Sequence, residues 1–405
     1  MTTPRRVVAA WVLYDLANTL FFFGVIGFYF PTWLAIVTRS PDSALAWAEA
    51  AAGVVVIFLA PLVGARTDLS GRRVPALRIS AGIAAAATLL IGRFSVVGSL
   101  VALAVALVAF HVGAAVYDSL LPAITSPEQR GRVSGLGVGV GYLGSFLGLG
   151  AGTILLANGA TYSTVFNALG FGFLVFAIPA CTLIKEQASL PKTSTATAGV
   201  LASWRKAASV PGIRRFLFGR FLYTDAINTL ISGFLVIYLR QELGFTDTNT
   251  RTLVATAIAA SLLGGLLGGW CTDRYGAKPT LLATLGLWLV AMALAAVTRQ
   301  PALAWAVGPL GGIALGSTWT SDRVLMAGLT PTPLLGEFYG LYATVGRFAS
   351  VLGPLLWVFV AETLDWGRRA AVVSLAGLVL IAFVVLRGLP QNDSVSPAVN
   401  LSSTA

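Results

Sequence analysis

Apolar runs long enough to cross a bilayer fill almost the whole of this chain. A membrane-spanning helix needs about 20 apolar residues. Only 11% of the 405 residues are charged, against about 25% in a soluble domain. The sequence therefore predicts an all-α membrane protein with twelve transmembrane helices. We expect these helices near 8–37, 44–65, 75–92, 95–123, 133–156, 162–184, 214–239, 250–271, 279–298, 301–328, 338–361 and 369–387.

The two halves of the chain repeat each other. GARTDLSGRR at 64–73 matches GWCTDRYGAK at 269–278, and the aspartates lie 273 − 68 = 205 residues apart. RGRVSG and LGEFYG, which follow the fourth and tenth segments, repeat at the same shift. The repeat predicts two pseudo-symmetric six-helix bundles. Their expected limits are 1–184 and 214–389, with a linker at 185–213 and a disordered tail at 390–405. Within the linker, VLASWRKAASV predicts an amphipathic helix on the membrane surface.

The basic residues give the orientation of the chain. About 17 Lys and Arg lie in the termini, the linker and the even-numbered loops, and about 7 lie in the odd-numbered loops. The positive-inside rule then puts both termini in the cytoplasm. Topology accounts for the net charge of +11, so no nucleic-acid partner is required. With two cysteines, Cys181 and Cys271, the chain has no disulfide framework.

The repeated loop has the pattern G-x-x-x-D-x-x-G-[RK], and its first copy, with two arginines at 72–73, is the better match, because Ala277 separates the glycine from Lys278 in the second copy. A carboxylate beside a helix N-terminus is favoured by the helix dipole, and glycine permits the turn. The pattern resembles the signature loop of the major facilitator superfamily. That resemblance implies a latch between the two halves in one access state, whereas the alternative is an ordinary basic loop. The candidate residues are Asp68, Gly71, Arg72, Asp273, Gly276 and Lys278.

Four acidic residues lie inside predicted helices 1, 4, 7 and 10, where an ionisable group is costly unless it faces a cavity or a partner. In the superfamily these helices line the central cavity. Two of the four precede an asparagine by three residues, so each pair shares a helix face, and the two faces would oppose each other. We expect proton or substrate binding there, and structural hydrogen bonds are the alternative. The residues are Asp15 with Asn18, Asp225 with Asn228, Asp118 and Asp322.

Asp118 and Asp322 lie close to the expected cytoplasmic helix ends, where they serve either as gate residues or as loop anchors. Arg323 is placed to pair with Asp118. His111, the only histidine, precedes Asp118 by seven residues, so it is a proton-relay candidate, or else a packing residue. Arg347 is a candidate for the cytoplasmic gate. We expect Arg220 to snorkel to the inner surface.

Four further stretches resemble one branch of the superfamily. They are WVLYDLANT, YDSLLPAITSPEQRGRVSGLGVGVGYLGS, YTDAINT and GEFYGLYATVGRFASVLGPLL, which together span residues 11 to 356. They are similar to the vacuole-effluxer (autophagy-related) and bacterial "unknown major facilitator" family. The yeast branch implies efflux of amino acids. Asp118 stands where the family often has Asn, and TSDRV at 320–324 replaces a Ser-Arg-Ser type run, so the substrate of this chain can differ.

The chain is predicted to be a monomeric secondary transporter of a bacterial inner (plasma) membrane, working by alternating access. It has no nucleotide-binding motif, no metal-ligand spacing and no catalytic constellation, so we expect no cofactor, no metal and no enzyme activity. We expect proton-coupled export of a small polar or amphipathic, amino-acid-like metabolite. A drug or natural-product efflux pump is the runner-up, and a membrane sensor without flux is a third class.

Overall fold

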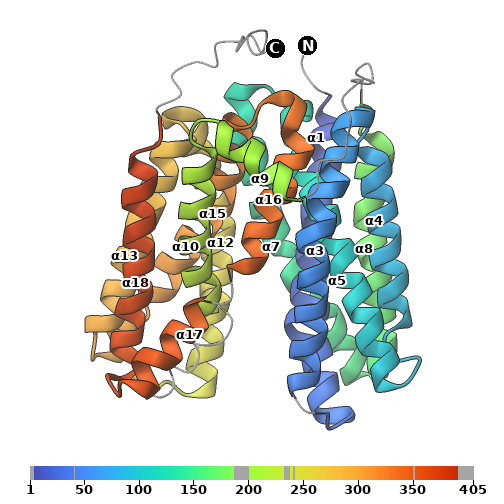
Figure 1. Ribbon diagram of the computed structural model, residues 1–405. Helices are drawn as coiled ribbons and strands as arrows, with labels where there is room; N and C mark the ends of the chain where they lie inside the picture. Colours follow the sequence, from blue (N-terminus) through green and yellow to red (C-terminus); the bar gives the residue numbers. More distant parts are fainter. Residues whose placement is uncertain are drawn as a thin grey trace.

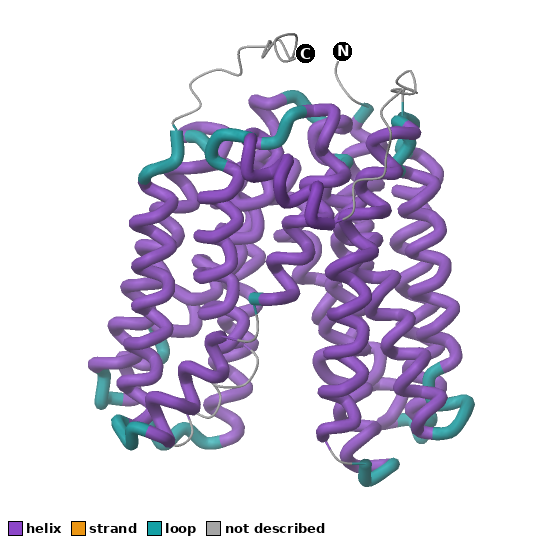
Figure 2. Tube along the Cα trace, in the orientation of Figure 1, coloured by secondary structure: helices purple, strands orange, loops and turns teal. Residues whose placement is uncertain are grey.

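A computed structural model of the chain describes residues 4–40, 42–186, 200–231, 238–239, 242–349 and 352–390. All regular structure in these residues is helical, as Figure 2 shows. The first part of the chain forms α1 (Arg5–Phe21), η1 (Phe22–Tyr29), α2 (Phe30–Thr32), η2 (Trp33–Val37), α3 (Asp42–Ser70), α4 (Val74–Leu90), α5 (Val96–Ser119), α6 (Leu121–Ile124), η3 (Pro127–Gln129), α7 (Arg130–Ala157) and α8 (Tyr162–Leu183).

The second part begins with a short helix that crosses one end of the molecule and continues with long helices (Figure 1). These elements are α9 (Val200–Ser209), α10 (Ile213–Thr229), α12 (Asp247–Tyr275), α13 (Ala277–Val297), α14 (Pro301–Ala304), α15 (Val307–Leu329), η5 (Thr332–Leu334), α16 (Leu335–Phe348), α17 (Leu352–Val358), η6 (Phe359–Thr363) and α18 (Gly367–Arg387).

Nine helices in the described part of the chain are long and apolar enough to cross a membrane. Three predicted segments are not among them: 75–92, 214–239 and 301–328. Their described parts are nevertheless mainly helical: the first contains α4, the second α10, and the third α14 and most of α15. α4 is apolar but has only 17 residues. The count of twelve spans therefore stays a prediction, while the all-helical character of the described residues agrees with the sequence.

Local sequence signals explain where several helices begin and end. Ser95, Thr161 and Thr246 precede α5, α8 and α12, and each side-chain oxygen accepts a backbone N–H three residues later. Such N-caps satisfy donors that the first helical turn leaves unpaired. α3 and α12 are followed by Gly71 at φ +64° and Gly276 at φ +94°, a backbone region open to glycine. The two glycines are equivalent in the repeat, since 276 − 71 = 205.

The buried apolar residues form two large clusters that follow the two parts of the chain. One cluster consists of described residues between 207 and 389, and the other of residues between 11 and 184 together with Val324. Each cluster packs the inward faces of its own helices, so each part has its own core. The domain limits at 184, 214 and 389 stay predictions.

The start of α1 and the end of α18 lie at the same end of the helix bundle, which we call the terminal side, and the opposite end is the far side (Figure 1). The two groups of helices approach each other at the terminal side and diverge toward the far side. α7 packs against α12 and α15, and α16 packs against α3 and α5. A Cβ on Gly135 of α7 would lie 2.9 Å from Cα of Gly269 on α12. Small residues therefore let these helices meet backbone to backbone.

The predicted linker helix is present as α9, but it packs on protein. It contacts α3, α10 and α16 and lies across the terminal side (Figure 1). Ser203 and Ala207 are buried, and Trp204 packs against the apolar cluster of the second part of the chain. The apolar face of this amphipathic helix is therefore covered by helix ends, and the expected place on a membrane surface is wrong. Linker residues 187–199 and tail residues 391–405 lie outside the described residues.

Candidate functional site

Arg323 of α15 joins the two parts of the chain through two carboxylates of the first part. Its Nη1 lies 3.1 Å from Oδ2 of Asp15 on α1, and its Nε lies 2.9 Å from Oδ1 of Asp118 on α5. The guanidinium carbon also lies 5.3 Å from the centre of the Trp11 ring and 5.5 Å from that of Tyr117. The predicted pairing of Arg323 with Asp118 is therefore present.

A second buried pair lies beside the first and belongs entirely to the second part of the chain. Arg220 of α10 forms an ion pair with Asp322 of α15. Tyr223 Oη donates to one oxygen of Asp322 at 3.0 Å, and Tyr342 Oη donates to the other at 2.9 Å. The guanidinium of Arg220 stacks 3.5 Å from the centre of the Tyr342 ring. Arg220 is only 6% exposed, so the prediction that it snorkels to the surface is wrong.

These five charged residues form what we call the ion-pair network: Asp15, Asp118, Asp322, Arg220 and Arg323. With all five ionised, three negative and two positive charges leave a formal charge of −1. Bringing charges out of water is costly, and only close pairing offsets the cost. The network therefore contains one more carboxylate than its two arginines neutralise.

Three of the four predicted intramembrane carboxylates thus converge on two arginines. The fourth, Asp225, is fully buried on α10, and its backbone carbonyl accepts the hydroxyl of Thr229. Its partner in the motif, Asn228, donates Nδ2 to the carbonyl of Ala349 at 2.8 Å. Asn18 on α1 is 9% exposed, and its Oδ1 is buried without a hydrogen-bond partner among the residues that the structure describes. The predicted opposition of the two Asp-Asn faces across a cavity stays a prediction.

His111 lies farther from the terminal side than the network. It precedes Asp118 by seven helical residues, which is about 10 Å along α5. Its Nε2 is buried and has no hydrogen-bond partner in the described part of the chain, so it makes no direct bond to Asp118 through that atom. Arg347, at the end of α16, donates Nη2 to the backbone carbonyl of Glu49 on α3 at 3.3 Å.

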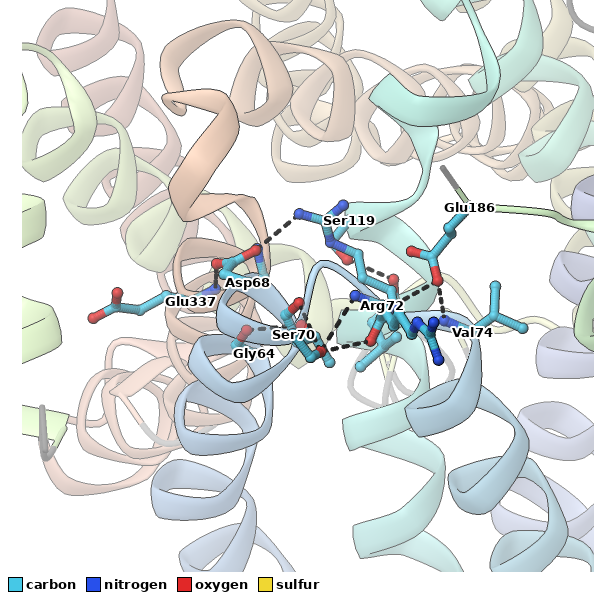
Figure 3. Close-up of polar contacts among 12 residues, drawn as sticks. Gly64, Asp68, Ser70, Arg72, Val74, Ser119, Glu186 and Glu337 are labelled. Atoms are coloured by element: carbon cyan, nitrogen blue, oxygen red, sulfur yellow. Dashed lines mark hydrogen bonds and ion pairs between the residues drawn. The ribbon is translucent and has the colours of Figure 1, made fainter. Parts of the chain in front are cut away.

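The first copy of the repeated loop closes the terminal side between α3 and α16. Asp68 accepts the backbone N–H groups of Gly336 and Glu337, each at 2.8 Å, in the first turn of α16. Figure 3 shows the Asp68 carboxylate turned toward the backbone of Glu337. A carboxylate at this position meets free N–H groups and the positive end of the helix dipole.

The second copy makes the same contact with the roles of the two parts exchanged. Asp273 of α12 accepts the backbone N–H groups of Gly131 at 2.6 Å and Arg132 at 2.9 Å, at the start of α7. The acceptors differ by 273 − 68 = 205 residues, and the donors by 336 − 131 = 205. The terminal side is therefore held by two pseudo-symmetric carboxylate contacts, and each ties one half to a helix N-terminus of the other.

The basic residues of the two loops differ in what they bind. Arg73 forms the ion pair with Asp68 at 2.8 Å, while the predicted Arg72 is exposed. Lys278 donates to the carbonyl of Leu389 at 2.6 Å, which ties the start of α13 to the end of the described chain. Glu186 accepts the N–H groups of residues 73 and 74 and so caps α4 (Figure 3).

Sequence reasoning missed several partners in these clusters. Arg73, Arg132 and Glu337 adjoin motif residues, but the pattern alone does not say which neighbour turns toward the carboxylate. Glu337 is buried and accepts Lys206 of α9 at 3.2 Å. The signal for Arg220 was present, because an embedded arginine seeks an embedded carboxylate.

The chain resembles transporters along most of its length. The family model described as "Vacuole effluxer Atg22 like" matches residues 37–398. The chain belongs to the vacuole effluxer Atg22-like family. The "Uncharacterized MFS-type transporter YxiO" of Bacillus subtilis (strain 168) is 24% identical over 412 residues, which cover 95% of both chains. "Autophagy-related protein 22" of Coccidioides immitis (strain RS) is 25% identical, and the match covers 58% of this chain and 45% of that protein.

The fold agrees with this assignment. The crystal structure of the human organic anion transporter MFSD10 (TETRAN) superimposes with a TM-score of 0.75 at 18% identity, covering 94% of this chain and 99% of that one. The predicted major facilitator fold and family are therefore confirmed. This Atg22-like chain is a multi-pass membrane protein and a secondary transporter, and its family and fold are those of transporters rather than enzymes.

Proposed function

We propose that this Atg22-like chain is a proton-coupled exporter of a small polar or amphipathic solute, working by alternating access with both termini in the cytoplasm. The observation that carries the proposal is the bridge from Arg323 in one half to Asp15 and Asp118 in the other. A charged bridge between moving halves can link proton binding to the access change. The amino-acid-like character of the solute comes from the family and is tested separately below.

The coupling follows from competition between Arg323 and a proton for the carboxylates of Asp15 and Asp118. When Asp15 and Asp118 are ionised, both hold Arg323, and the two loop carboxylates Asp68 and Asp273 also join the halves. A proton that enters from the far side and neutralises Asp15 or Asp118 removes one arm of the bridge. The halves then separate more easily at the terminal side, where the proton leaves and solute enters. This order of events gives exchange of protons for solute.

The orientation and the membrane complete the proposal. The distribution of Lys and Arg supports a cytoplasmic terminal side. With the terminal side closed, this arrangement corresponds to a transporter whose solute path faces away from the cytoplasm. In a bacterium the membrane would be the inner, plasma membrane.

The test is transport by purified protein in liposomes. Labelled amino acids and cationic dyes are offered under counterflow, with and without an imposed pH gradient. The variants are Asp15→Asn and Asp118→Asn, and the control is Asp365→Asn, an exposed aspartate at a left-handed position that asparagine also tolerates. Transport should follow the pH gradient in the wild-type protein and the control. In the two network variants, counterflow should persist while the response to the gradient falls at least tenfold.

Three results would count against this proposal in different ways. Gradient-driven transport that stays intact in both network variants removes these carboxylates from the coupling step. Transport that ignores pH in the wild-type protein excludes protons as the coupling ion. Transport of lipophilic cationic dyes without any polar solute favours the alternative, a drug or natural-product efflux pump.

A further inference from the structure

A small apolar cluster joins three helices between the network and the far side. Val56 of α3 and Val112 of α5 are buried there, and Ala343 of α16 packs against them. α3 and α5 run toward the terminal side, and α16 runs away from it. His111 adjoins Val112 on α5, and Arg347 lies about one turn beyond Ala343 on α16, toward the far end of the molecule. Both residues therefore lie beside this cluster.

The side chain of Arg347 crosses from one half to the other at this level. Its Nη2 donates to the Glu49 carbonyl at 3.3 Å, and the guanidinium lies beside Gly53 of α3. A Cβ at residue 53 would lie 3.5 Å from Nη2 and 3.7 Å from Nε, which is ordinary van der Waals contact. The guanidinium of α16 therefore packs directly on α3 at this position.

Two nitrogen atoms at this place are buried and have no hydrogen-bond partner among the described residues. They are Nε of Arg347 and Nε2 of His111. Both residues adjoin the same apolar cluster, on the neighbouring helices α5 and α16. A buried donor without an acceptor destabilises the protein, and more so when it is charged. Both residues are only half-buried overall, so part of each side chain is exposed although these two nitrogens are not.

The repeat sets this pair apart from the pseudo-symmetric closure. At the shift of 205, the position equivalent to Arg347 is Tyr142, since 347 − 205 = 142. The position equivalent to His111 is Gly316, since 111 + 205 = 316. The loop contacts of Asp68 and Asp273 obey the repeat, whereas the Arg–His pair occurs once. The other half of the chain has no equivalent Arg–His pair. This difference between the halves is expected of a site for a solute that itself lacks two-fold symmetry.

We propose that Arg347 and His111 bind a carboxylate group of the transported solute. The guanidinium supplies two N–H donors in a fork that matches a carboxylate, and His111 adds a third donor from its ring. Glu49, whose backbone carbonyl accepts Arg347, is half-buried, so its carboxylate is the candidate partner for the ammonium group of a zwitterionic solute. This assignment rests on the proposed transport function and names the class of its substrate.

The experiment measures equilibrium binding to the protein in lipid nanodiscs, without any gradient. The probes are a labelled panel of α-amino acids, the matching amino-acid amides, which lack the carboxylate, and the matching 2-oxo acids, which lack the ammonium group. The variants are Arg347→Gln, Arg347→Lys, His111→Leu and His111→Gln. Arg299→Gln is the control, because Arg299 is exposed in a connecting segment.

At least one carboxylate-bearing probe should bind the wild-type protein and the control at least tenfold more tightly than its amide. Loss of a charge-assisted hydrogen bond should raise the Kd of that probe about 10- to 100-fold in Arg347→Gln. Arg347→Lys should recover only part of the loss, because lysine lacks the fork. His111→Leu should weaken binding, and His111→Gln should restore it through the amide donor.

Equal binding of acids and amides overturns the assignment, and so does a Kd within twofold of wild type in Arg347→Gln. Absence of binding by every carboxylate-bearing probe also overturns it. Glu49→Gln separates the two sources of a carboxylate: weaker binding of amino acids alone indicates a zwitterion, and unchanged binding indicates an organic anion. Because no gradient is used, binding without proton-coupled transport would refute the proposed function and leave this assignment standing.

Discussion

The contact between Asp68 and the first turn of α16 offers a quantitative test of how the terminal side stays closed. Asp68 accepts two backbone N–H groups and pairs with Arg73, and its side chain is 7% exposed. Asp68→Asn keeps one oxygen, so it retains at most one of the two backbone bonds and loses the ion pair. A hydrogen bond to a buried charged group contributes about 1.5–3 kcal/mol. The open population at the terminal side should therefore rise about 10- to 150-fold.

Cysteine labelling can follow this opening, because the chain has only two cysteines to remove. Cys181 and Cys271 are replaced by alanine, and a reporter cysteine is placed at Ala60 of α3, which is 2% exposed. The carbonyl of Ala60 lies against Gly340 of α16, so the reporter reacts with a maleimide only when α3 and α16 separate. The rate is measured in nanodiscs and normalised to the denatured protein.

Glu128→Gln is the matched control, because this carboxylate belongs to the same half and is exposed. Labelling of the reporter should rise at least tenfold in Asp68→Asn and stay within twofold in the control. An equal rate in the two variants would refute the idea that the Asp68 contact stabilises the closed terminal side.

Two further predictions use the same reporter. Gly64→Val places a Cβ within 2.9 Å of the Glu337 nitrogen, so α3 and α16 cannot close and labelling should exceed that of Asp68→Asn; a wild-type rate would contradict this packing. Lys206→Ala removes an ion pair to Glu337 whose lysine is 44% exposed. Such a pair contributes less than about 1 kcal/mol, so labelling should change less than about fivefold. A larger rise in the labelling rate would show that α9 contributes substantially to keeping the terminal side closed.

Much of the fold could be predicted because membrane helices appear in a sequence as long apolar runs. Hydrophobic runs, the shift of 205 residues and the loop aspartates all pointed to two related halves. Asp68 and Asp273 could be singled out because each recurs with the glycine that follows it. Only the structure showed that both carboxylates accept hydrogen bonds from helix N-termini of the opposite half, because almost every residue has a backbone N–H and no residue type identifies the donors.

The polar interior was harder to predict, because it depends on depth and on neighbours far away in the chain. Asp118 and Arg323 were paired correctly from their place near helix ends. Arg220 was assigned to the surface, although it pairs with Asp322. An arginine near a helix end can reach either the membrane surface or a buried carboxylate, and the sequence does not distinguish these two positions. α9 was predicted as a helix from its amphipathic pattern, but a pattern cannot distinguish lipid from protein as the covering surface.

The pairing of Asp118 with Arg323 has a consequence for how such a protein could arise. Their positions are equivalent in the repeat, since 323 − 118 = 205, so each residue meets its own structural counterpart across the axis between the halves. In a dimer of two identical half-chains the same place would bring Asp against Asp or Arg against Arg. This salt bridge therefore requires an ancestor in which both halves were already encoded separately and free to diverge. Neither half, expressed alone, should form a stable homodimer with this interface.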